Sequence, residues 1–158
     1  MDTGVFLVMI VTGATRDRAK MLQTPIMKWM LYAFLKSGVI LVIGFGKCFT
    51  MWFFNYHGFV DEYGIHWNFF MTIAITEFLI NLVVELWWLS DIFVIGLFFS
   101  YEYCLWSFGL KDWVLQEERN PNNFIDANWE GILSIPLFLF IQYVANYIKI
   151  AFLAFKRK

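Results

Sequence analysis

The sequence has little charge for its length. Of its 158 residues only 16% are charged, whereas 60% are apolar and 22% are aromatic, and the mean hydropathy is +0.60. A soluble domain has roughly a quarter of its residues charged and about half apolar. The nineteen Phe, eight Trp and seven Tyr exceed what one small core could bury, which disfavours a water-soluble globule. We therefore expect a membrane protein.

Basic residues and cysteines are also few. Twelve Lys and Arg stand against thirteen Asp and Glu, a net charge of -1 that argues against a nucleic-acid partner. Cys48 and Cys104 are too few for a disulfide framework. Both lie in apolar sequence without the neighbouring ligands of a metal site, so we expect no bound metal.

Long apolar runs are abundant. A helix needs about 20 mostly apolar residues to cross a bilayer core, and five segments compete for that role. These segments are residues 4–14, 27–54, 68–88, 92–108 and 131–154. The sequence therefore predicts an all-α, polytopic transmembrane helix bundle of about five spans, in a single membrane domain that covers residues 1–158.

The distribution of Lys and Arg indicates an orientation, because cytoplasmic loops carry an excess of them. If the five spans alternate, the loop after the first span and the C-terminal tail receive most of the cations. The opposite face receives only Lys111 and Arg119. We therefore expect the N-terminus, residues 55–67 and residues 109–130 to share the non-cytoplasmic face.

Five charged residues lie inside the expected spans, namely Lys36, Lys47, Glu77, Glu85 and Glu102. An ionised group at mid-bilayer is costly and usually faces the bundle interior or a wet cavity. We expect ion pairs between helices. The alternatives are a proton or ion pathway, which no repeat or broken-helix pair supports, and for Lys47 a place facing an active cavity.

Polar residues gather at the mouth of the third span. Glu62 and His66 lie four residues apart, which would stack them on one face if the local backbone is helical. A carboxylate beside a His orients the ring and raises its basicity, which suits a general base that takes a hydroxyl proton. The alternative is that both are solvated interfacial residues and that Gly64 marks a turn.

A second polar cluster, residues 126–132, opens the fifth span on the same expected face. Asp126 or Asn128 could cap that helix, and Glu130 in its first turn suits the helix dipole, which needs no catalytic role. Asp2 is expected at the same face, ahead of the first span. Three separated pieces of sequence would thus bring polar groups to one side, as a lumen-facing active site requires.

The same residues resemble a known family. Residues 62–70 read Glu-Tyr-Gly-Ile-His-Trp-Asn-Phe-Phe. This closely matches the Glu-Tyr-Gly-Val-His-Trp-Asn-Phe-Phe signature of the GPI inositol acyltransferases. These are the phosphatidylinositol-glycan biosynthesis class W proteins, called GPI-anchored wall transfer protein in fungi. Residues 1–5 resemble that family's Met-Asp-Phe/Leu-Gly-Val, and residues 127–134 its Ala-Asn-Arg-Glu-Gly-Ile-x-Ser. Residues 44–47 parallel a Gly-x-Gly/Leu-Arg stretch, so the chain matches the family's middle portion.

The resemblance implies a multi-pass enzyme of the endoplasmic reticulum membrane. Such a membrane-bound O-acyltransferase moves a fatty acyl group from acyl-CoA to the inositol hydroxyl of glucosaminyl-phosphatidylinositol, in GPI-anchor biosynthesis. Acyl-CoA is then a co-substrate, and no other cofactor is expected. From side-chain chemistry we expect Asp2 or His66 as the base, with Glu62 orienting His66. The expected substrate-binding residues are Asn68 and Asn128 as oxyanion donors, with Glu130, Lys47 and Trp67.

Some positions depart from the family pattern. The family's Arg before Glu-Gly-Ile is Trp129 here, a common Lys falls at Trp52, and a carboxylate is replaced by Gly58. Family members are also longer, so we expect a fragment or a shortened member of a larger bundle. These departures support an alternative function, a non-catalytic membrane paralogue that binds lipid or a partner.

Overall fold

The computed structural model describes residues 3–17, 23–54, 64, 66–85, 89–114, 120 and 122–156. Its helices are α1 (Thr3–Thr15), α3 (Ile26–Phe53), α4 (Phe69–Glu85), α5 (Leu89–Ser107), α6 (Leu110–Val114), α7 (Phe124–Ala127), α8 (Trp129–Leu133) and α9 (Ile135–Lys156). No strand occurs in these parts of the chain. The prediction of an all-α protein is confirmed.

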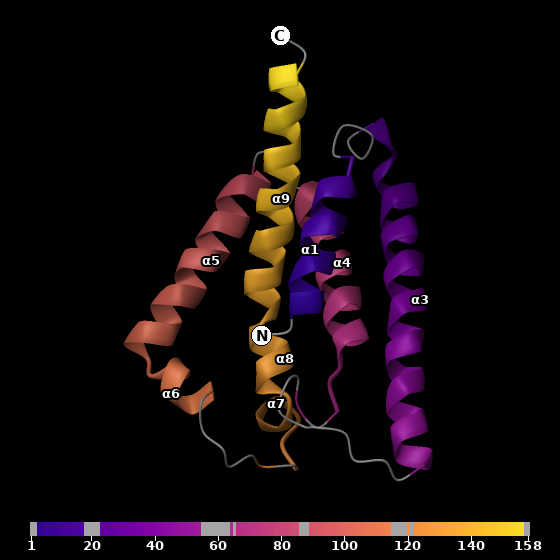
Figure 1. The fold of residues 1–158 in the computed structure, drawn as a ribbon, viewed down its shortest axis with the longest axis vertical. Helices are drawn as coiled ribbons and strands as arrows, with labels where there is room; N and C mark the ends of the chain where they lie inside the picture. The colour runs from indigo at the N-terminus through magenta and orange to yellow at the C-terminus, as the bar shows by residue number, and fades with distance from the viewer. Residues whose placement is uncertain are drawn as a thin grey trace.

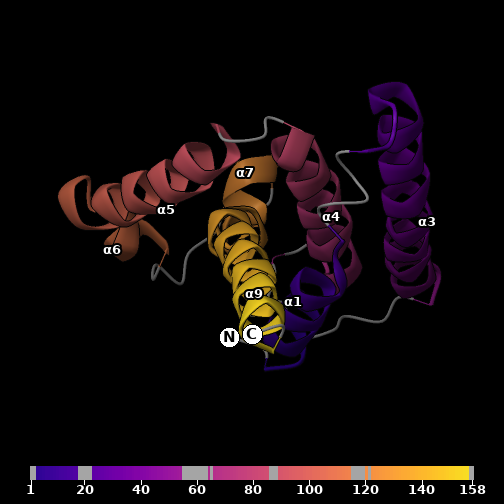
Figure 2. The same cartoon turned by 90° about the horizontal axis from the view of Figure 1, so that it is seen from above.

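The long helices lie side by side and alternate in direction (Figure 1). α3 and α5 run downward in that view, whereas α4 and α9 run upward. Seen from above, α3, α4, α9 and α5 form an open row, and α1 packs mainly on α9 (Figure 2). The short helices α6, α7 and α8 all lie at the lower end, where α3 ends and α4 begins.

Two stretches are long and apolar enough to cross a membrane. They are Ile26–Phe53 and Trp129–Lys156, the second of which includes α8 and α9. At a rise of about 1.5 Å per residue, each exceeds the thickness of a bilayer core. The apolar stretches of α1 and α4 are shorter; they cover Gly4–Thr15 and Phe69–Val83. A membrane helical protein fits these lengths, while the count of about five spans stays a prediction.

Nine of the buried apolar side chains form two clusters. One contains Ile80, Val83, Val94, Leu139 and Tyr143, and the other contains Val5, Met9, Ile73 and Phe138. The outward faces of α3 and α5 are also apolar, with exposed Met27, Leu31, Phe45, Trp52, Ile92, Phe99 and Trp106. Exposed apolar surface on this scale marks contact with a membrane or another protein.

α1 and α9 approach each other so closely that their backbones touch. A Cβ atom added at Gly13 would lie 2.3 Å from the carbonyl oxygen of Gln142. Asn146 strengthens the same contact, because its Nδ2 donates to the carbonyl oxygens of Gly13 at 3.0 Å and Arg16 at 2.8 Å. The end of α1 is therefore fixed to the middle of α9.

A partly buried ion cluster links the residue after α1 to α3 and α4. The Arg16 guanidinium donates to Glu77 Oε1 at 3.0 Å, and Lys36 Nζ donates to Glu77 Oε2 at 2.9 Å. Arg16 also donates to the amide oxygen of Asn81. Burial lowers the pKa of Arg16, and the Glu77 carboxylate opposes that shift. The expected pairing between helices is confirmed for Lys36 and Glu77, with Arg16 as an additional partner.

The other charged residues of the expected spans behave differently. Lys47 is exposed and Glu102 is half-buried, and neither forms an ion pair with another residue that the structure describes. The side chain of Glu85 lies outside the described residues. The pairing prediction thus holds for one of the two lysines.

Candidate functional site

The site residues that the sequence predicts, where the structure describes them, all lie at the lower end of the bundle (Figure 1). His66, Trp67 and Asn68 lie directly before α4, which begins at Phe69. Asn128 lies between α7 and α8, Glu130 is in the first turn of α8, and Lys47 is near the end of α3. Two of the predicted catalytic residues, Asp2 and Glu62, lie outside the described residues.

The backbone around His66 is not helical. Gly64 has a φ of +111°, in the left-handed region that favours glycine, and His66 lies in a bend. A Cβ at Gly64 would lie 2.5 Å from Asn128 Cα and 2.6 Å from the carbonyl oxygen of Ala127. The helical condition for the stacking is therefore not met at Gly64 and His66, because Gly64 turns the chain to pass against the α7–α8 junction. Glu62 itself lies outside the described residues, so its relation to His66 stays a prediction.

His66 and Asn128 are joined by a direct hydrogen bond. The backbone N–H of His66 donates to Asn128 Oδ1 at 2.8 Å, and Asn128 Nδ2 donates to the carbonyl oxygen of Phe124 at 2.8 Å. Asn128 is fully buried. Its amide thus holds the segment before α4 against α7, so the structure brings the two polar clusters of the sequence together.

The expected capping by Asp126 or Asn128 does not occur. Asn128 occupies the N-cap position of α8, but its side chain makes no capping hydrogen bond. Asn123 is the residue that caps a helix here, since its Oδ1 accepts from the N–H groups of Ile125 at 3.0 Å and Asp126 at 3.4 Å. The Asp126 carboxylate instead accepts from the N–H of Asn120 at 2.9 Å. The helical structure begins earlier than expected, at α7, so Asp126 lies inside a helix and the N-cap position belongs to Asn123.

Asn68 ties α4 to α3. Its Nδ2 donates to the carbonyl oxygen of Gly44 at 2.9 Å and to Cys48 Sγ at 3.1 Å. Its Oδ1 accepts from the N–H groups of Phe70 at 3.0 Å and Met71 at 3.2 Å, which caps the start of α4. The Asn68 amide is buried, and its hydrogen bonds all go to the protein.

Trp67 holds the same segment to α8. Its indole N–H donates to Thr72 Oγ1 at 2.8 Å, and its ring lies 6.3 Å from that of Phe124. A Cβ at Gly131 would lie only 2.2 Å from Trp67 Cδ1. The half-buried ring therefore packs directly on the backbone of α8, where only glycine leaves it room.

The imidazole of His66 is exposed, and it makes no hydrogen bond with any residue that the structure describes. Glu130 is half-buried, and Lys47 is exposed on α3. Contacts therefore connect His66, Trp67, Asn68 and Asn128 with one another, while Lys47 joins them only by lying near the same end. In the described parts of the chain, no three side chains of His, Cys, Asp or Glu gather as a metal site would require.

Sequence reasoning missed Cys48 as a part of this junction. Its thiol donates to the carbonyl oxygen of His66 at 3.5 Å and accepts from Asn68. Gly44 and Cys48 lie one helical turn apart on α3, so both face the start of α4. That four-residue spacing was the available signal, although it does not specify a partner.

Comparison with known proteins identifies the family. The GWT1 family matches residues 1–158, the whole chain. The chain belongs to the GWT1 family. The GPI-anchored wall transfer protein 1 of Kluyveromyces lactis is 36% identical over 139 residues, which cover 85% of this chain and 30% of that relative. The phosphatidylinositol-glycan biosynthesis class W protein of Dictyostelium discoideum is 34% identical over 109 residues, 69% of this chain and 21% of that relative.

A third relative covers more of the chain. The GPI-anchored wall transfer protein 1 of Schizosaccharomyces pombe is 29% identical over 150 residues, or 93% of this chain and 32% of that relative. The resemblance carried by residues 62–70 is thereby confirmed. This member of the GWT1 family spans a third or less of the length of these curated relatives.

Proposed function

We propose that the chain acts in GPI-anchor biosynthesis as part of a membrane-bound acyltransferase. The enzyme would move a fatty acyl group from acyl-CoA to the inositol hydroxyl of glucosaminyl-phosphatidylinositol in the endoplasmic reticulum membrane. Membership in the GWT1 family supports the pathway. The observation that carries the proposal is the hydrogen bond between His66 and Asn128, because it joins the two polar motifs at one end of the bundle.

The reaction needs a base and a stabilised oxyanion. The inositol oxygen attacks the thioester carbonyl carbon, a C–O bond forms, the C–S bond breaks, and the hydroxyl proton passes to the base. The departing CoA thiolate then takes a proton. His66 is suited to the role of base, because its exposed imidazole is not engaged by the described protein. Asp2 stays the alternative base. In the proposed site Glu62 is the carboxylate that orients His66.

The two asparagines receive a different role from the one their chemistry first indicated. The side-chain amides of Asn68 and Asn128 are both buried and form hydrogen bonds with other groups of the protein. We therefore propose that these two residues position the segment that contains His66. Lys47, which is exposed, is suited to a phosphate of the glycolipid. Glu130 would bind sugar hydroxyls, and Trp67 would shape the wall beside them.

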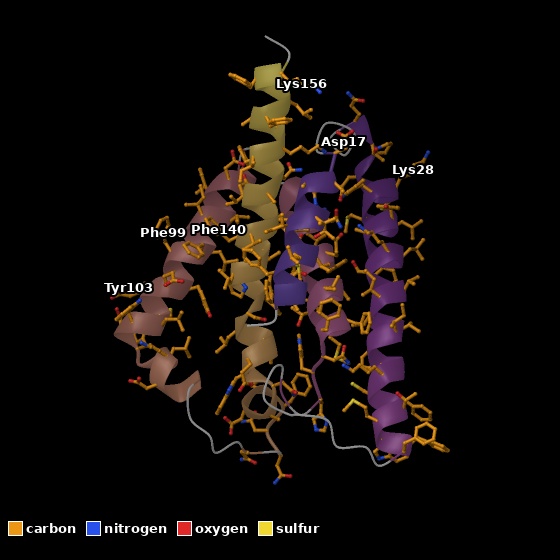
Figure 3. The ribbon with its side chains drawn as sticks, viewed as in Figure 1. Asp17, Lys28, Phe99, Tyr103, Phe140 and Lys156 are labelled. Atoms are coloured by element: carbon orange, nitrogen blue, oxygen red, sulfur yellow. The ribbon has the colours of Figure 1, made fainter. Side chains whose placement is uncertain are left out.

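The proposed orientation places this end of the bundle in the lumen, with a multi-pass topology of about five spans. Lys28 and Lys156 extend from the upper end (Figure 3). Lys149, in the last third of α9, is near the same end. Cations concentrated at one end favour the cytoplasmic side for that end.

The test is restoration of inositol acylation in cells that lack the endogenous acyltransferase. The unmodified chain, its His66→Ala variant and a control variant, Asn122→Ala, would be expressed at equal membrane levels, and the acylated glycolipid would be measured by mass spectrometry. Asn122 is an exposed residue of the same region. We expect acylation with the chain and the control and a loss of more than about tenfold with His66→Ala. Equal acylation by all three would remove the role of His66.

The alternative function is a non-catalytic membrane paralogue that binds lipid or a partner. One observation favours it: Trp129, which stands where the family has an Arg, is 1% exposed. The position therefore offers no cation to a substrate phosphate. A properly inserted chain that restores no acylation, in cells where a full-length relative does so, would decide for this alternative.

A further inference from the structure

An apolar groove runs between α1 and α9, away from the polar site. It has a volume of about 550 Å³ and is lined by nine apolar side chains and one cation, Lys149. Phe6, Ile10 and Ala14 form its wall on α1, and Val144 and Ile148 lie on the α9 wall. A volume of this size lies in the range of about 300–1,000 Å³ that small-molecule sites occupy. α1 and the upper part of α9 lie at the edge of the helix arrangement (Figure 2).

The groove is elongated along the helices. Phe6, Ile10 and Ala14 are spaced by four residues, so they form one stripe of about 12 Å along α1. The stripe ends beside Thr15, where α1 itself ends near the upper end of the bundle. An elongated, almost wholly apolar groove suits a hydrocarbon chain better than a compact polar ligand.

The cation lies near the upper end of the groove. Lys149 Nζ donates to the carbonyl oxygen of Arg16 at 2.9 Å, which brings the ammonium group to the residue that follows α1. An ammonium group has three donors, and the described residues engage one of them at Lys149. Lysines in such places extend their apolar stems along the protein and place their charge at the level of lipid headgroups.

Other charged groups of this end favour an anionic ligand. Figure 3 shows Lys28, Lys156 and Asp17 at the upper end. Asp91, in the first turn of α5, belongs to the same end, where its carboxylate accepts from the hydroxyls of Tyr143 and Tyr147. The Glu77 carboxylate is neutralised by Arg16 and Lys36 inside the bundle. Lysines near an anionic membrane surface each contribute to lipid attraction.

We propose that this groove binds one acyl chain of an anionic glycerophospholipid, with Lys149 contacting its phosphate. In the proposed orientation the lipid belongs to the cytoplasmic leaflet. It is distinct from the substrates of the acyl transfer, because the His66 site lies at the opposite end of the bundle. Its effect is to hold α1 against α9 and to keep the apolar walls of the groove covered.

The experiment measures the phospholipids retained by the intact, membrane-extracted chain. The purified protein would be analysed by native mass spectrometry and lipid extraction after exposure to mixed micelles of phosphatidylinositol and phosphatidylcholine. Ala14→Phe fills the groove, and Ala151→Phe is its control, because Ala151 is an exposed alanine of α9 that does not line the groove. We expect Ala14→Phe alone to lose most of the bound phospholipid.

A second pair of variants tests the charge. Lys149→Gln keeps a donor for the Arg16 carbonyl but removes the cation, and Lys156→Gln removes a cation that does not line the groove. We expect Lys149→Gln to retain lipid but to lose about fivefold in its preference for phosphatidylinositol over phosphatidylcholine. Circular dichroism of each variant checks that the helices are intact.

Three results would overturn the proposal. The first is equal retention by Ala14→Phe and Ala151→Phe, and the second is an unchanged preference in Lys149→Gln. The third is that long-chain acyl-CoA displaces the phospholipid and that Ala14→Phe weakens the binding of both ligands equally. That result would make the groove the site that binds the acyl donor. None of these results depends on acylation activity, so failure here leaves the proposed reaction unaffected.

Discussion

The backbone N–H of His66 and the side-chain oxygen of Asn128 are 2.8 Å apart, although 62 positions separate the residues in sequence. The bond connects the segment before α4 to the junction of α7 and α8. It makes Asn128 a positioning residue for His66, because the same amide is held by the carbonyl oxygen of Phe124.

Asn128→Ala should destabilise the protein and misplace His66. The substitution leaves the His66 N–H and the Phe124 carbonyl without their partner, at a cost of about 1–3 kcal/mol. Thermal melting in detergent would show a lower Tm, and acylation per folded molecule should also fall. Asn122→Ala, at an exposed asparagine nearby, should change neither quantity. A normal acylation rate in Asn128→Ala would mean that His66 does not depend on this bond.

Gly64→Ala should be more damaging than a typical Gly→Ala change. Gly64 has a φ of +111°, and the added Cβ would lie 2.5 Å from Asn128 Cα. Both the strained backbone and the clash raise the free energy of the folded state. Gly96→Ala is the control, since its Cβ would meet no atom within 4 Å and alanine favours the helix by about 1 kcal/mol. Equal melting temperatures for the two variants would contradict the close passage of Gly64.

Gly131→Ala should be rescued in part by a smaller residue at position 67. The added Cβ would lie 2.2 Å from Trp67 Cδ1, so the indole must move and lose its hydrogen bond to Thr72. We expect Gly131→Ala and Trp67→Leu each to lower the Tm. Because the two residues touch, the double variant should be more stable than the sum of the single effects indicates. Strict additivity in this double-mutant cycle would show that they do not contact.

Glu77→Gln should destabilise the bundle more than Lys36→Gln. Glu77 has a side chain that is 1% exposed and pairs with both Arg16 and Lys36. Its loss leaves the buried Arg16 cation without a counter-charge, a change that costs about 3–5 kcal/mol. Lys36 is 42% exposed, and solvent screens its contribution. Protease resistance in native membranes would rank the variants, with the exposed Asp112→Asn as control. A greater loss in Lys36→Gln would contradict this account.

Much of the helical architecture followed from the sequence alone. The apolar runs became α1, α3, α4, α5 and α9, because an amide backbone in an apolar setting satisfies its hydrogen bonds within a helix. The family could also be recognised from residues 62–70, since a nine-residue motif carries its identity in local order. The pairing of Lys36 with Glu77 was predictable in kind, because a buried charge requires a partner.

The tertiary structure alone decided which partner each polar group takes. Nothing near Asn128 in the sequence indicates that its amide bonds to His66 instead of capping α8. Of the two backbone shapes considered ahead of the third span, the structure shows the turn at Gly64. Arg16 follows the first expected span, in the loop expected to carry many of the cations, yet its side chain reaches Glu77. Local sequence sets which backbone shapes are favourable. Hydrogen bonds and close contacts between distant segments depend on how the helices pack, which is a property of the whole chain.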